Sequence, residues 1–574
     1  MKKIIALSLL LLTVPAVFAQ RHANSRPTAT GAAAAIRFED ITHAAGIRFS
    51  LECGGPEKRY IMESMCGGVG FIDYDADGWL DIVLLNGSTL KAQPQTNAVR
   101  IYHNNHDLTF TDVTSELGVN ESGWGMGIAV ADYNNDGYPD LYLTFLDHAV
   151  LLRNDKGRHF ANVTAEAHVG NENRWGTSAA FGDFDNDGFA DLYVTNYVDL
   201  DLKALPEFGS TAYCQYRGIK VSCGPRGLKG SRDRLYHNNG DGTFTEVTEE
   251  AGIDPQGYYG LGVLWLDYDN DGCQDIYVAN DSSPSLLYKG DCKGHFASVG
   301  VEAGVAFSAD GLTQAGMGVD AADFDHDGWL DLVKTNFSDD TNNLYRNLGN
   351  GEFIDVNGTS GFGPISTSLL GFGVRFADFD NDGWPDIMVV NGHVNPQVEG
   401  HGFGVTYKER DLLFRNLQNG KFAEVSATAG KWMQVPRVGR GLAVADFNND
   451  GRLDLLISHL DAEPILALNS AAPAGRALTI ELISAQGSHI PLGARVTVMA
   501  GALTQVDEVR TNRSYLSASD HRLHFGLGDY KGTVKITVRW ISGRVETYTD
   551  LPTRRIVVIQ EGKGILSSSG RSTY

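Results

Sequence analysis

The chain has 574 residues, too many for one ordinary hydrophobic core, so several modules or an array of repeats are expected. It carries 71 acidic against 47 basic side chains, which gives a formal net charge of −24. This balance argues against a nucleic-acid-binding protein, because the phosphate backbone selects basic surfaces.

The first residues are typical of a secretory signal peptide. A Met-Lys-Lys start precedes an apolar run from Ile4 to Val14, and Val17-Phe18-Ala19 places small residues at the cleavage positions. We therefore expect a signal peptide at 1–19 and a linker at 20–35. No later stretch reaches about 18 apolar residues, so no membrane span is expected. The prediction is an exported protein that is secreted, periplasmic or associated with the cell surface.

One nine-residue pattern, Asp-x-Asp/Asn-x-Asp-Gly-x-x-Asp, occurs seven times and indicates a repeat architecture. It places side-chain oxygens at positions 1, 3, 5 and 9 and Gly at position 6, as a Ca²⁺ loop requires. The candidate metal ligands are Asp73, Asp75, Asp77 and Asp81; Asp132, Asn134, Asp136 and Asp140; Asp183, Asp185, Asp187 and Asp191; Asp267, Asp269, Asp271 and Asp275; Asp323, Asp325, Asp327 and Asp331; Asp378, Asp380, Asp382 and Asp386; and Asp446, Asn448, Asp450 and Asp454.

Two other readings of these loops were weighed. An EF-hand is excluded because it would carry Glu at position 12, where this chain has apolar residues or Lys334. Plain turn chemistry also favours Asp, Asn and Gly, but a turn does not need four mutually repelling carboxylates. We therefore expect up to seven structural Ca²⁺ ions, held more weakly where Asn134 and Asn448 replace Asp.

Strand patterns surround each loop. An alternating Gly-rich strand precedes it, as in Gly125-Met-Gly-Ile-Ala-Val-Ala-Asp132, and an apolar strand follows, as in Asp191-Leu-Tyr-Val-Thr-Asn196. A third strand ends in aromatic-x-Asn, as in Leu344-Tyr-Arg-Asn347, and a fourth reads Phe-x-x-Val, as in Phe244-Thr-Glu-Val-Thr248. Four antiparallel strands repeated seven times predict an all-β, seven-bladed β-propeller over residues 36–470.

The N-terminal strand is predicted to close the last blade. A Phe-x-x-Val strand follows each of the first six loops but not the seventh, and a matching strand, Phe38-Glu-Asp-Ile-Thr42, stands at the start of the repeat region. Pairing the two ends of the chain in this way removes an exposed sheet edge.

The six cysteines fall into three local pairs, Cys53 with Cys66, Cys214 with Cys223, and Cys273 with Cys292. An oxidising compartment favours disulfides over free thiols, although the spacing ranks the pairings without fixing them. The second pair lies in an insertion at about 198–232, which is either a functional loop or a decoration of the blade.

After Asn469 the repeat stops, and residues 470–475 read as a linker. A separate small β-domain is expected at 476–562, with strands near 477–484, 494–499, 505–511, 533–540, 545–549 and 555–560. The remaining residues, 563–574, form a tail.

The chain resembles a known family over about 36–562. The blades resemble FG-GAP/VCBS repeats, as in the integrin α-subunit propeller. The C-terminal segment resembles the ASPIC/UnbV domain through Gly493-Ala-Arg-Val-Thr-Val, Ser514-Tyr-Leu-Ser-Ala-Ser-Asp520 and Leu523-His-Phe-Gly-Leu-Gly528. Together they are similar to the cartilage acidic protein family, including its bacterial members. The resemblance implies a seven-bladed propeller outside the cytoplasm with Ca²⁺ in its blade loops, and it implies no reaction.

Two functions are carried forward. The favoured one is a non-catalytic binding, adhesion or scaffold protein that engages an extracellular or periplasmic protein or glycan. The alternative is an exported Ca²⁺-dependent enzyme acting on polysaccharide or lipid. No catalytic motif supports an enzyme, so no catalytic residue is assigned.

Two further groups of polar residues were considered. His393, Glu399 and His401 form either a second polar site at a blade end or ordinary loop positions. Arg510, Arg513, Asp520 and His521 form either an anion or sugar site or a buried ion pair.

Overall fold

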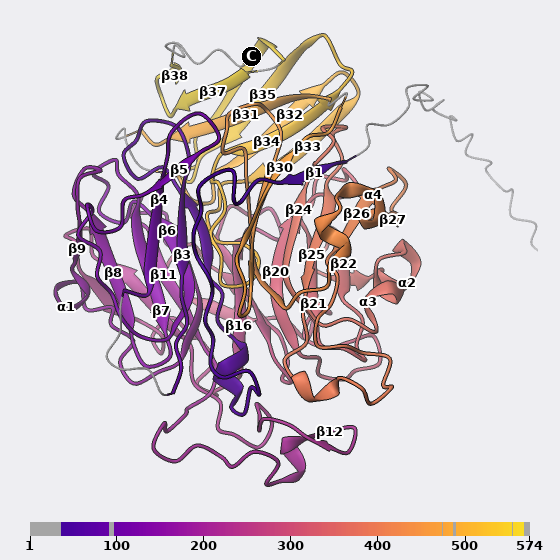
Figure 1. Cartoon of the computed structure of the whole chain (residues 1–574). Coiled ribbons are helices and arrows are strands. Elements are labelled where there is room, and N and C mark those ends of the chain that lie inside the picture. The colour runs from indigo at the N-terminus through magenta and orange to yellow at the C-terminus, as the bar shows by residue number, and fades with distance from the viewer. Residues whose placement is uncertain (1–35, 91–96, 473–474, 486–489, 554, 567–574) are drawn as a thin grey trace, which may run out of the picture. The chain divides into compact units, whose positions relative to one another are not determined.

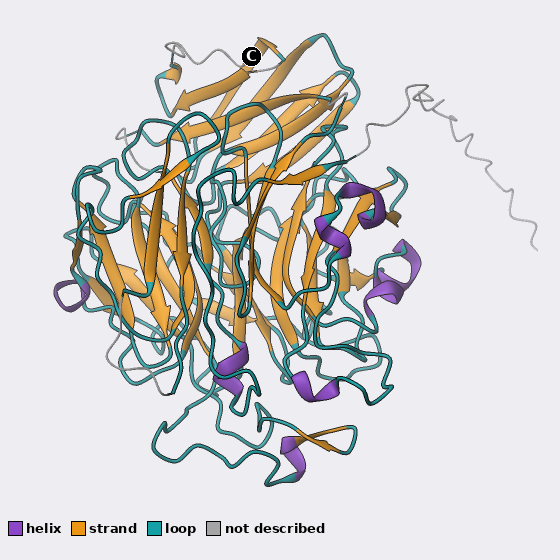
Figure 2. Ribbon diagram, viewed as in Figure 1, coloured by secondary structure: helices purple, strands orange, loops and turns teal. Residues whose placement is uncertain are grey.

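The computed structural model describes residues 36–90, 97–472, 475–485, 490–553 and 555–566. The predicted signal peptide and linker (1–35) and the last part of the predicted tail (567–574) lie outside the described residues. Most regular structure within the described ranges is β-strand, which confirms the predicted all-β class (Figure 2).

Seven four-stranded antiparallel sheets follow one another along the described chain. In the order of their pairing they are β2 (Val69–Ile72), β3 (Asp81–Leu85), β4 (Val99–Asn104) and β5 (Phe110–Asp112); β6 (Gly125–Ala131), β7 (Asp140–Phe145), β8 (Ala149–Asn154) and β9 (Phe160–Asn162); β10 (Gly176–Gly182), β11 (Asp191–Asn196), β14 (Arg234–Asn238) and β15 (Phe244–Glu246); β16 (Gly260–Leu266), β17 (Asp275–Asn280), β18 (Leu286–Gly290) and β19 (Phe296–Ser298); β20 (Gly316–Ala322), β21 (Asp331–Asn336), β22 (Asn343–Asn347) and β23 (Phe353–Asp355); β24 (Gly371–Ala377), β25 (Asp386–Asn391), β26 (Leu412–Asn416) and β27 (Phe422–Glu424); and β28 (Gly439–Ala445), β29 (Asp454–His459), β30 (Ile465–Asn469) and β1 (Phe38–Asp40).

The sheets are arranged as the blades of a β-propeller, as predicted. The first strand of each sheet contacts the first strand of the next, and β28 contacts β2. Figure 1 shows the strands of these sheets standing side by side. Apolar side chains fill the space between neighbouring sheets; Phe184 and Trp265, for example, pack between the third and fourth. Each sheet therefore buries its faces against its two neighbours.

Glycine in the first strands allows the blades to converge. A Cβ atom added to Gly318 would lie 2.2 Å from the carbonyl oxygen of Phe372, and one added to Gly127 would lie 2.5 Å from that of Thr177. Since no side chain fits at these distances, the Gly-x-Gly pattern of the first strands follows from the close approach of backbones.

The N-terminal strand closes the last sheet, which confirms the prediction. Phe38 pairs with Asn469 and Asp40 with Ala467 in antiparallel register. Phe38 is buried and meets the Phe379 ring edge-on, with 5.3 Å between ring centroids. The two ends of the repeat region are thus held by backbone hydrogen bonds and by core packing.

Helices in the described residues are short. They are η1 (Ile61–Ser64), α1 (Thr164–Ala167), η2 (Ala212–Cys214), α2 (Asn357–Ser360), α3 (Gly363–Ser366), η3 (Pro396–Val398), α4 (Ser426–Ala429) and η4 (Trp432–Gln434). None of them is long and apolar enough to cross a membrane.

The three expected cysteine pairs are all disulfide-bonded: Cys53–Cys66, Cys214–Cys223 and Cys273–Cys292. The second bridge closes the insertion around a small hairpin of β12 (Gln215–Tyr216) and β13 (Ile219–Lys220). The insertion follows β11, so it lies at the end of the blades away from the acidic loops.

The C-terminal segment forms two further four-stranded sheets. One contains β34 (Leu523–Gly528), β31 (Arg476–Ile483), β37 (Arg555–Gln560) and β38 (Gly564–Ile565), and the other β33 (Leu503–Glu508), β32 (Arg495–Ala500), β35 (Thr533–Arg539) and β36 (Val545–Pro552). The sequence did not predict β34 or β38, and the strand expected near 505–511 ends at Glu508. It ends there because the chain turns away from the sheet and enters the ring of blades.

Residues 509–522, which we call the central segment, run along the inner strands of the propeller. Leu516 O accepts the N–H of Ile128 (3.1 Å), Ala518 N–H donates to Val69 O (3.0 Å), and Ser514 N–H donates to Val319 O (2.8 Å). Since these partners lie on β6, β2 and β20, the segment supplies hydrogen bonds to strand edges on different sides of the ring. The segment expected to belong to a separate domain is therefore part of the propeller's centre.

Candidate metal centres

The seven acidic loops lie where the first strand of each sheet turns into the second. In the first loop, both carboxylate oxygens of Asp73 accept backbone N–H groups, from Asp77 (3.0 Å) and Gly78 (2.8 Å). Ala76 and Gly78 adopt left-handed conformations, with φ of 59° and 87°, and so wrap the loop around the Asp73 side chain. The same pair of hydrogen bonds recurs at Asp132, Asp183, Asp323, Asp378 and Asp446.

The ninth-position carboxylate ties each loop to the body of its blade. Asp81 Oδ2 accepts the N–H of Tyr74 (3.2 Å), and its Oδ1 accepts the N–H of Asn104 at the end of the third strand (2.8 Å). The seven ninth-position carboxylates are all buried: Asp81, Asp140, Asp191, Asp275, Asp331, Asp386 and Asp454.

The asparagine that ends the third strand links neighbouring blades, a role the sequence analysis missed. Asn104 Nδ2 donates to Leu80 O in its own blade and to Phe447 O in the adjacent blade, both at 3.0 Å. Equivalent pairs of bonds are made by Asn154, Asn238, Asn347, Asn416 and Asn469. The repeated aromatic-x-Asn ending was the available signal, and the fourth blade departs from it with Gly290.

Asparagine at position 4 of the loops forms a second set of links. Asn449 Nδ2 donates to Gly78 O of the first loop (3.0 Å), and Asn381 Nδ2 donates to Gly451 O of the seventh (2.8 Å). Position 4 is variable in the nine-residue pattern, so the sequence did not predict these links.

The carboxylates within a loop gather closely. Oxygens of Asp73, Asp75 and Asp77 lie within 4.8 Å of one another, as do those of the corresponding residues in the third and fourth loops. Burial, followed by repulsion from the neighbouring carboxylates, raises the pKa of Asp73 to about 7 and that of Asp183 to about 8. A bound cation would relieve both costs.

The third-position carboxylates provide the test of whether the loops fit a metal. The Oδ1 atoms of Asp75, Asp185, Asp325 and Asp380 are buried and have no hydrogen-bond partner in the described structure. Such atoms are unfavourable unless something else binds them. A hard cation prefers carboxylate oxygens, so these four loops fit Ca²⁺.

A basic residue on the third strand distinguishes the loops from one another. His237 stands beside the third loop, with Nδ1 3.2 Å from Asp191 Oδ1. Arg415, by contrast, holds a permanent charge 2.8 Å from both Asp380 and Asp382. This position precedes the blade-linking asparagine, and the sequence analysis did not single it out.

His393, Glu399 and His401 do not share a site among the described contacts. His393 is fully buried, its Nδ1 accepts the N–H of Asn395 (3.0 Å), and burial lowers its pKa to about 3. Glu399 accepts the N–H of Tyr407 (2.8 Å), and His401 stacks on the ring of Phe403. Each residue therefore has a local structural partner.

The C-terminal polar group makes buried ion pairs. Arg510 and Arg513 both contact Asp507, the latter at 3.2 Å, and Arg522 pairs with Asp520 at 2.8 Å. These contacts fit the buried-ion-pair alternative for this group. They also hold the two ends of the central segment.

A partly open cavity of about 130 Å³ lies at the opposite end of the blades, beneath the insertion. Its lining is mainly aromatic and apolar, and includes Tyr197, Tyr216, Phe337 and Phe372. One buried carboxylate, Asp281, also lines it and accepts the Tyr197 hydroxyl at 2.6 Å.

Two protein families match the chain. The family described as "ASPIC and UnbV" matches residues 486–566. The family described as "FG-GAP-like repeat" matches residues 73–143, 147–194, 226–278, 267–334, 335–389 and 403–457, which together make up more than half of the chain.

Among curated relatives, cartilage acidic protein 1 of Xenopus tropicalis is 25% identical over 510 residues, covering 84% of this chain and 71% of the relative. The Homo sapiens protein of the same name is 25% identical over 509 residues, with coverages of 83% and 69%. Integrin alpha-7 of Homo sapiens is 35% identical over 101 residues, which are 16% of this chain and 9% of the integrin.

Among solved structures, an Agrocybe aegerita lectin that recognises non-reducing terminal N-acetylglucosamine is 16% identical, with a TM-score of 0.37; the match covers 70% of this chain and 87% of the lectin. BBS1N in its complex with ARL6DN is 10% identical, with a TM-score of 0.40 and coverages of 75% and 96%.

Proposed function

Since the chain belongs to the family of FG-GAP-like repeat proteins and carries a C-terminal ASPIC and UnbV segment, we propose that it is an exported calcium-binding scaffold. In this proposal it binds an extracellular or periplasmic protein or glycan and catalyses no reaction. Calcium fastens the corners of the blades, and the binding surface lies elsewhere.

The observation that supports calcium most strongly is the set of buried, unpartnered third-position oxygens, at Asp75, Asp185, Asp325 and Asp380. In each loop the residues at positions 1, 3, 5 and 9 would hold the ion, which supplies positive charge at a corner where carboxylates crowd. Because an unfolded chain does not assemble such a corner, binding energy becomes folding energy.

Thermal unfolding with and without calcium tests this part of the proposal. A ligand at about 100 times its Kd adds about 2.7 kcal/mol per site, so protein stripped with EDTA should melt many degrees below protein in millimolar Ca²⁺. Magnesium at the same concentration is the control, because its demand for compact octahedral geometry suits these loops poorly. Identical melting curves in EDTA and in Ca²⁺ would refute the proposal.

The proposed binding surface is the blade end that carries the insertion. The C-terminal sheets contact the acidic loops at the other end; Gly528 N–H, for example, donates to Asn381 O at 2.7 Å. On the insertion, Tyr213 is 60% exposed beside the aromatic cavity. Exposed aromatic surface beside a cavity is typical of a binding site.

A pull-down of exported material tests the surface. Tyr213→Ala should weaken capture of the protein or glycan partner, whereas Val301→Ala, which alters an equally exposed apolar residue elsewhere, should not. Equal capture by both variants would place the binding surface elsewhere.

Export is the last element of the proposal. Three disulfides suit an oxidising compartment, and the sequence predicts cleavage after about Ala19. N-terminal sequencing of the protein recovered outside the cytoplasm should begin near Gln20; recovery only in the cytoplasm, with Met1 retained, would contradict export.

A further inference from the structure

We propose that the protein's own Lys289 and Arg539 offset half of the formal charge of the fourth acidic loop, residues 267–275, and that this loop takes no calcium ion. This inference rests on the proposed function for the remaining loops. It assigns the fourth loop a different task, which is to seat the C-terminal sheets on the propeller.

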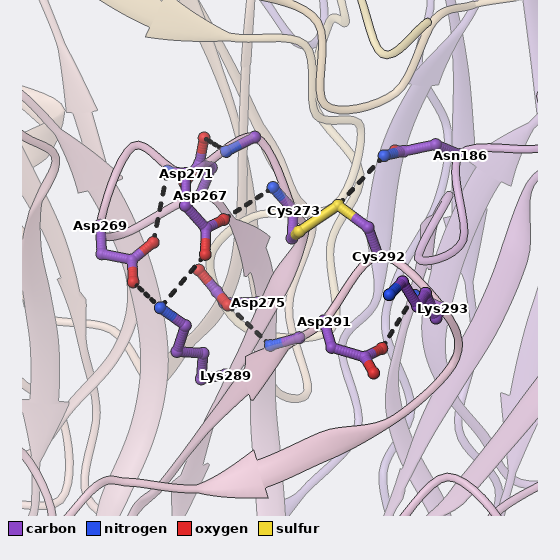
Figure 3. The surroundings of a disulfide bond; sticks show 12 residues. Asn186, Asp267, Asp269, Asp271, Cys273, Asp275, Lys289, Asp291, Cys292 and Lys293 are labelled. Atoms are coloured by element: carbon purple, nitrogen blue, oxygen red, sulfur yellow. Dashed lines mark hydrogen bonds and ion pairs between the residues drawn. A yellow bond between two sulfur atoms is a disulfide. The ribbon is translucent and has the colours of Figure 1, made fainter. Parts of the chain in front are cut away.

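Permanent cations contact three of the four candidate ligands in this loop. Figure 3 shows the contacts of Lys289. Lys289 Nζ contacts Asp269 and lies 3.1 Å from Asp271 Oδ2. Arg539 Nη2 contacts Asp267 Oδ2. The first, third and fifth positions therefore already face positive charge, and the two cations halve the formal charge of the four carboxylates.

The other described loops lack this combination. In the fifth loop Arg346 contacts only the third-position and fifth-position carboxylates, and Arg415 does the same in the sixth loop. The first and third loops face histidines, and no Lys or Arg contacts their ligands among the described ion pairs. Among the described ion pairs, only the fourth loop has a Lys or Arg on its first-position carboxylate.

The third-position carboxylate is also satisfied in the fourth loop. Asp269 Oδ1 accepts the N–H of Asp271 (3.4 Å), and its Oδ2 contacts Lys289. The corresponding Oδ1 atoms of Asp75 and Asp185 are buried without a partner. The buried oxygen without a partner in the fourth loop belongs to the first-position residue instead, as Asp267 Oδ1, and the other oxygen of that carboxylate contacts Arg539.

A covalent link fastens this corner. Cys273, at position 7 of the loop, is bonded to Cys292 in the turn after β18 (Figure 3). The third strand of this blade ends in Gly290, which has no side chain to reach the adjacent blade, and Asn186 Nδ2 of the third loop lies 3.3 Å from Cys292 Sγ. The disulfide therefore joins the loop to the turn after the third strand within this blade, where the third strand lacks the blade-linking asparagine.

Two C-terminal strands converge on the fourth and fifth loops. Arg539 of β35 also donates to Asn270 O (3.3 Å), and Arg495 of β32 donates to Gly328 O (2.8 Å). Arg495 is itself paired with Glu508 at 2.7 Å, and a Glu508 oxygen accepts the N–H of Asp267 at 3.2 Å. An ion in the fourth loop would have to displace Arg539 from this interface.

Counting bound ions by native mass spectrometry tests the inference on the whole mature protein. EDTA-stripped protein is titrated with calcium acetate, and loop variants are compared with the wild type. Asp271→Asn in the fourth loop should leave the ion count unchanged, whereas the matched Asp187→Asn in the third loop should lower it by one. Loss of an ion from Asp271→Asn would overturn the inference.

A gain-of-site variant separates the inference from the proposed function. Lys289→Met combined with Arg539→Met should add one ion to the wild-type count, and Lys293→Met, in the same turn, should add none. If the wild-type protein binds no ion and the double variant binds one, the proposed function is overturned and the inference is supported. Absence of ions from both would overturn both.

A crystal of the wild-type protein soaked in Tb³⁺ provides a measurement that needs no variant. Anomalous peaks are expected at the first and third loops and none at residues 267–275. A peak at the fourth loop, with Lys289 displaced, would overturn the inference.

Discussion

Replacing Tyr515 by Ala tests whether the central segment is part of the propeller's core. Tyr515 is fully buried, its ring centroid lies 4.8 Å from that of Phe372, and its hydroxyl donates to Met65 O at 2.9 Å. Truncation of a buried aromatic ring costs about 3–5 kcal/mol, and a buried carbonyl left unpaired costs about 1–3 kcal/mol. We expect Tyr515→Ala to lower the free energy of unfolding by about 4–8 kcal/mol, a large share of the stability of a typical domain.

Urea unfolding in saturating Ca²⁺, followed by circular dichroism, measures this effect. Tyr515→Phe keeps the ring and loses only the hydrogen bond, so it should cost about 1 kcal/mol. Tyr213→Ala, at a position 60% exposed, is the control and should change the free energy of unfolding by less than about 0.5 kcal/mol.

The three variants should differ in how far they lower the free energy of unfolding. Destabilisation should fall from Tyr515→Ala to Tyr515→Phe to Tyr213→Ala. If Tyr515→Ala unfolds like the surface control, the segment does not occupy the centre of the ring in solution.

Three further predictions concern the fastening of the blades. Phe38→Ala should lower the free energy of unfolding by about 3–5 kcal/mol, because it removes the buried ring of the closing strand from the core. The exposed Glu39→Ala should lower it little, and equal effects of the two variants would contradict closure of the last blade by this strand. Asn104→Ala should lower the free energy of unfolding in urea by about 2 kcal/mol, because it removes both hydrogen bonds of the link between blades. The exposed Asn105→Ala is the control and should change it very little. No effect of Asn104→Ala would show that the link is dispensable. In EDTA the free energy of unfolding should fall as pH rises from about 4 to about 8, because burial and the neighbouring carboxylates raise the pKa of Asp183 to about 8 in the folded protein, which keeps a proton that the unfolded chain has lost. Ca²⁺ should abolish this slope, and a flat profile in EDTA would contradict the burial and crowding of this carboxylate.

The sequence predicted the blades because their signals are local and repeated. Each loop contains its candidate ligands within nine residues, and the first three strands of each blade show their alternation over four to seven residues. The closing strand could be predicted because the seventh blade lacks its fourth strand, and the segment that begins at Phe38 matches the pattern of the fourth strands. The disulfide pairs were ranked correctly because each joins cysteines close in sequence.

The central segment was not predicted because its partners are distant and mostly backbone. Ser517 Oγ accepts the N–H of Leu442 (3.1 Å) and Ser519 Oγ that of Val444 (3.1 Å), contacts that leave no period in the sequence. The strand β34 was missed because two glycines interrupt its alternation.

The basic side chains beside the loops were also missed, for a different reason. All seven loops present nearly the same ligands, so the nine-residue pattern alone predicts nearly equal sites. The difference comes from basic side chains outside the pattern, from Lys289 on the third strand and from Arg539, which lies 272 residues after Asp267. Only the folded arrangement brings these cations to the loop.

Calorimetric titration of calcium into the folded, EDTA-stripped mature protein tests the central claim most directly. We predict saturable heat of binding by millimolar Ca²⁺, with more than one ion per chain and fewer ions than acidic loops. No heat at millimolar Ca²⁺, from protein that is folded by circular dichroism, would show that the blade corners hold without metal.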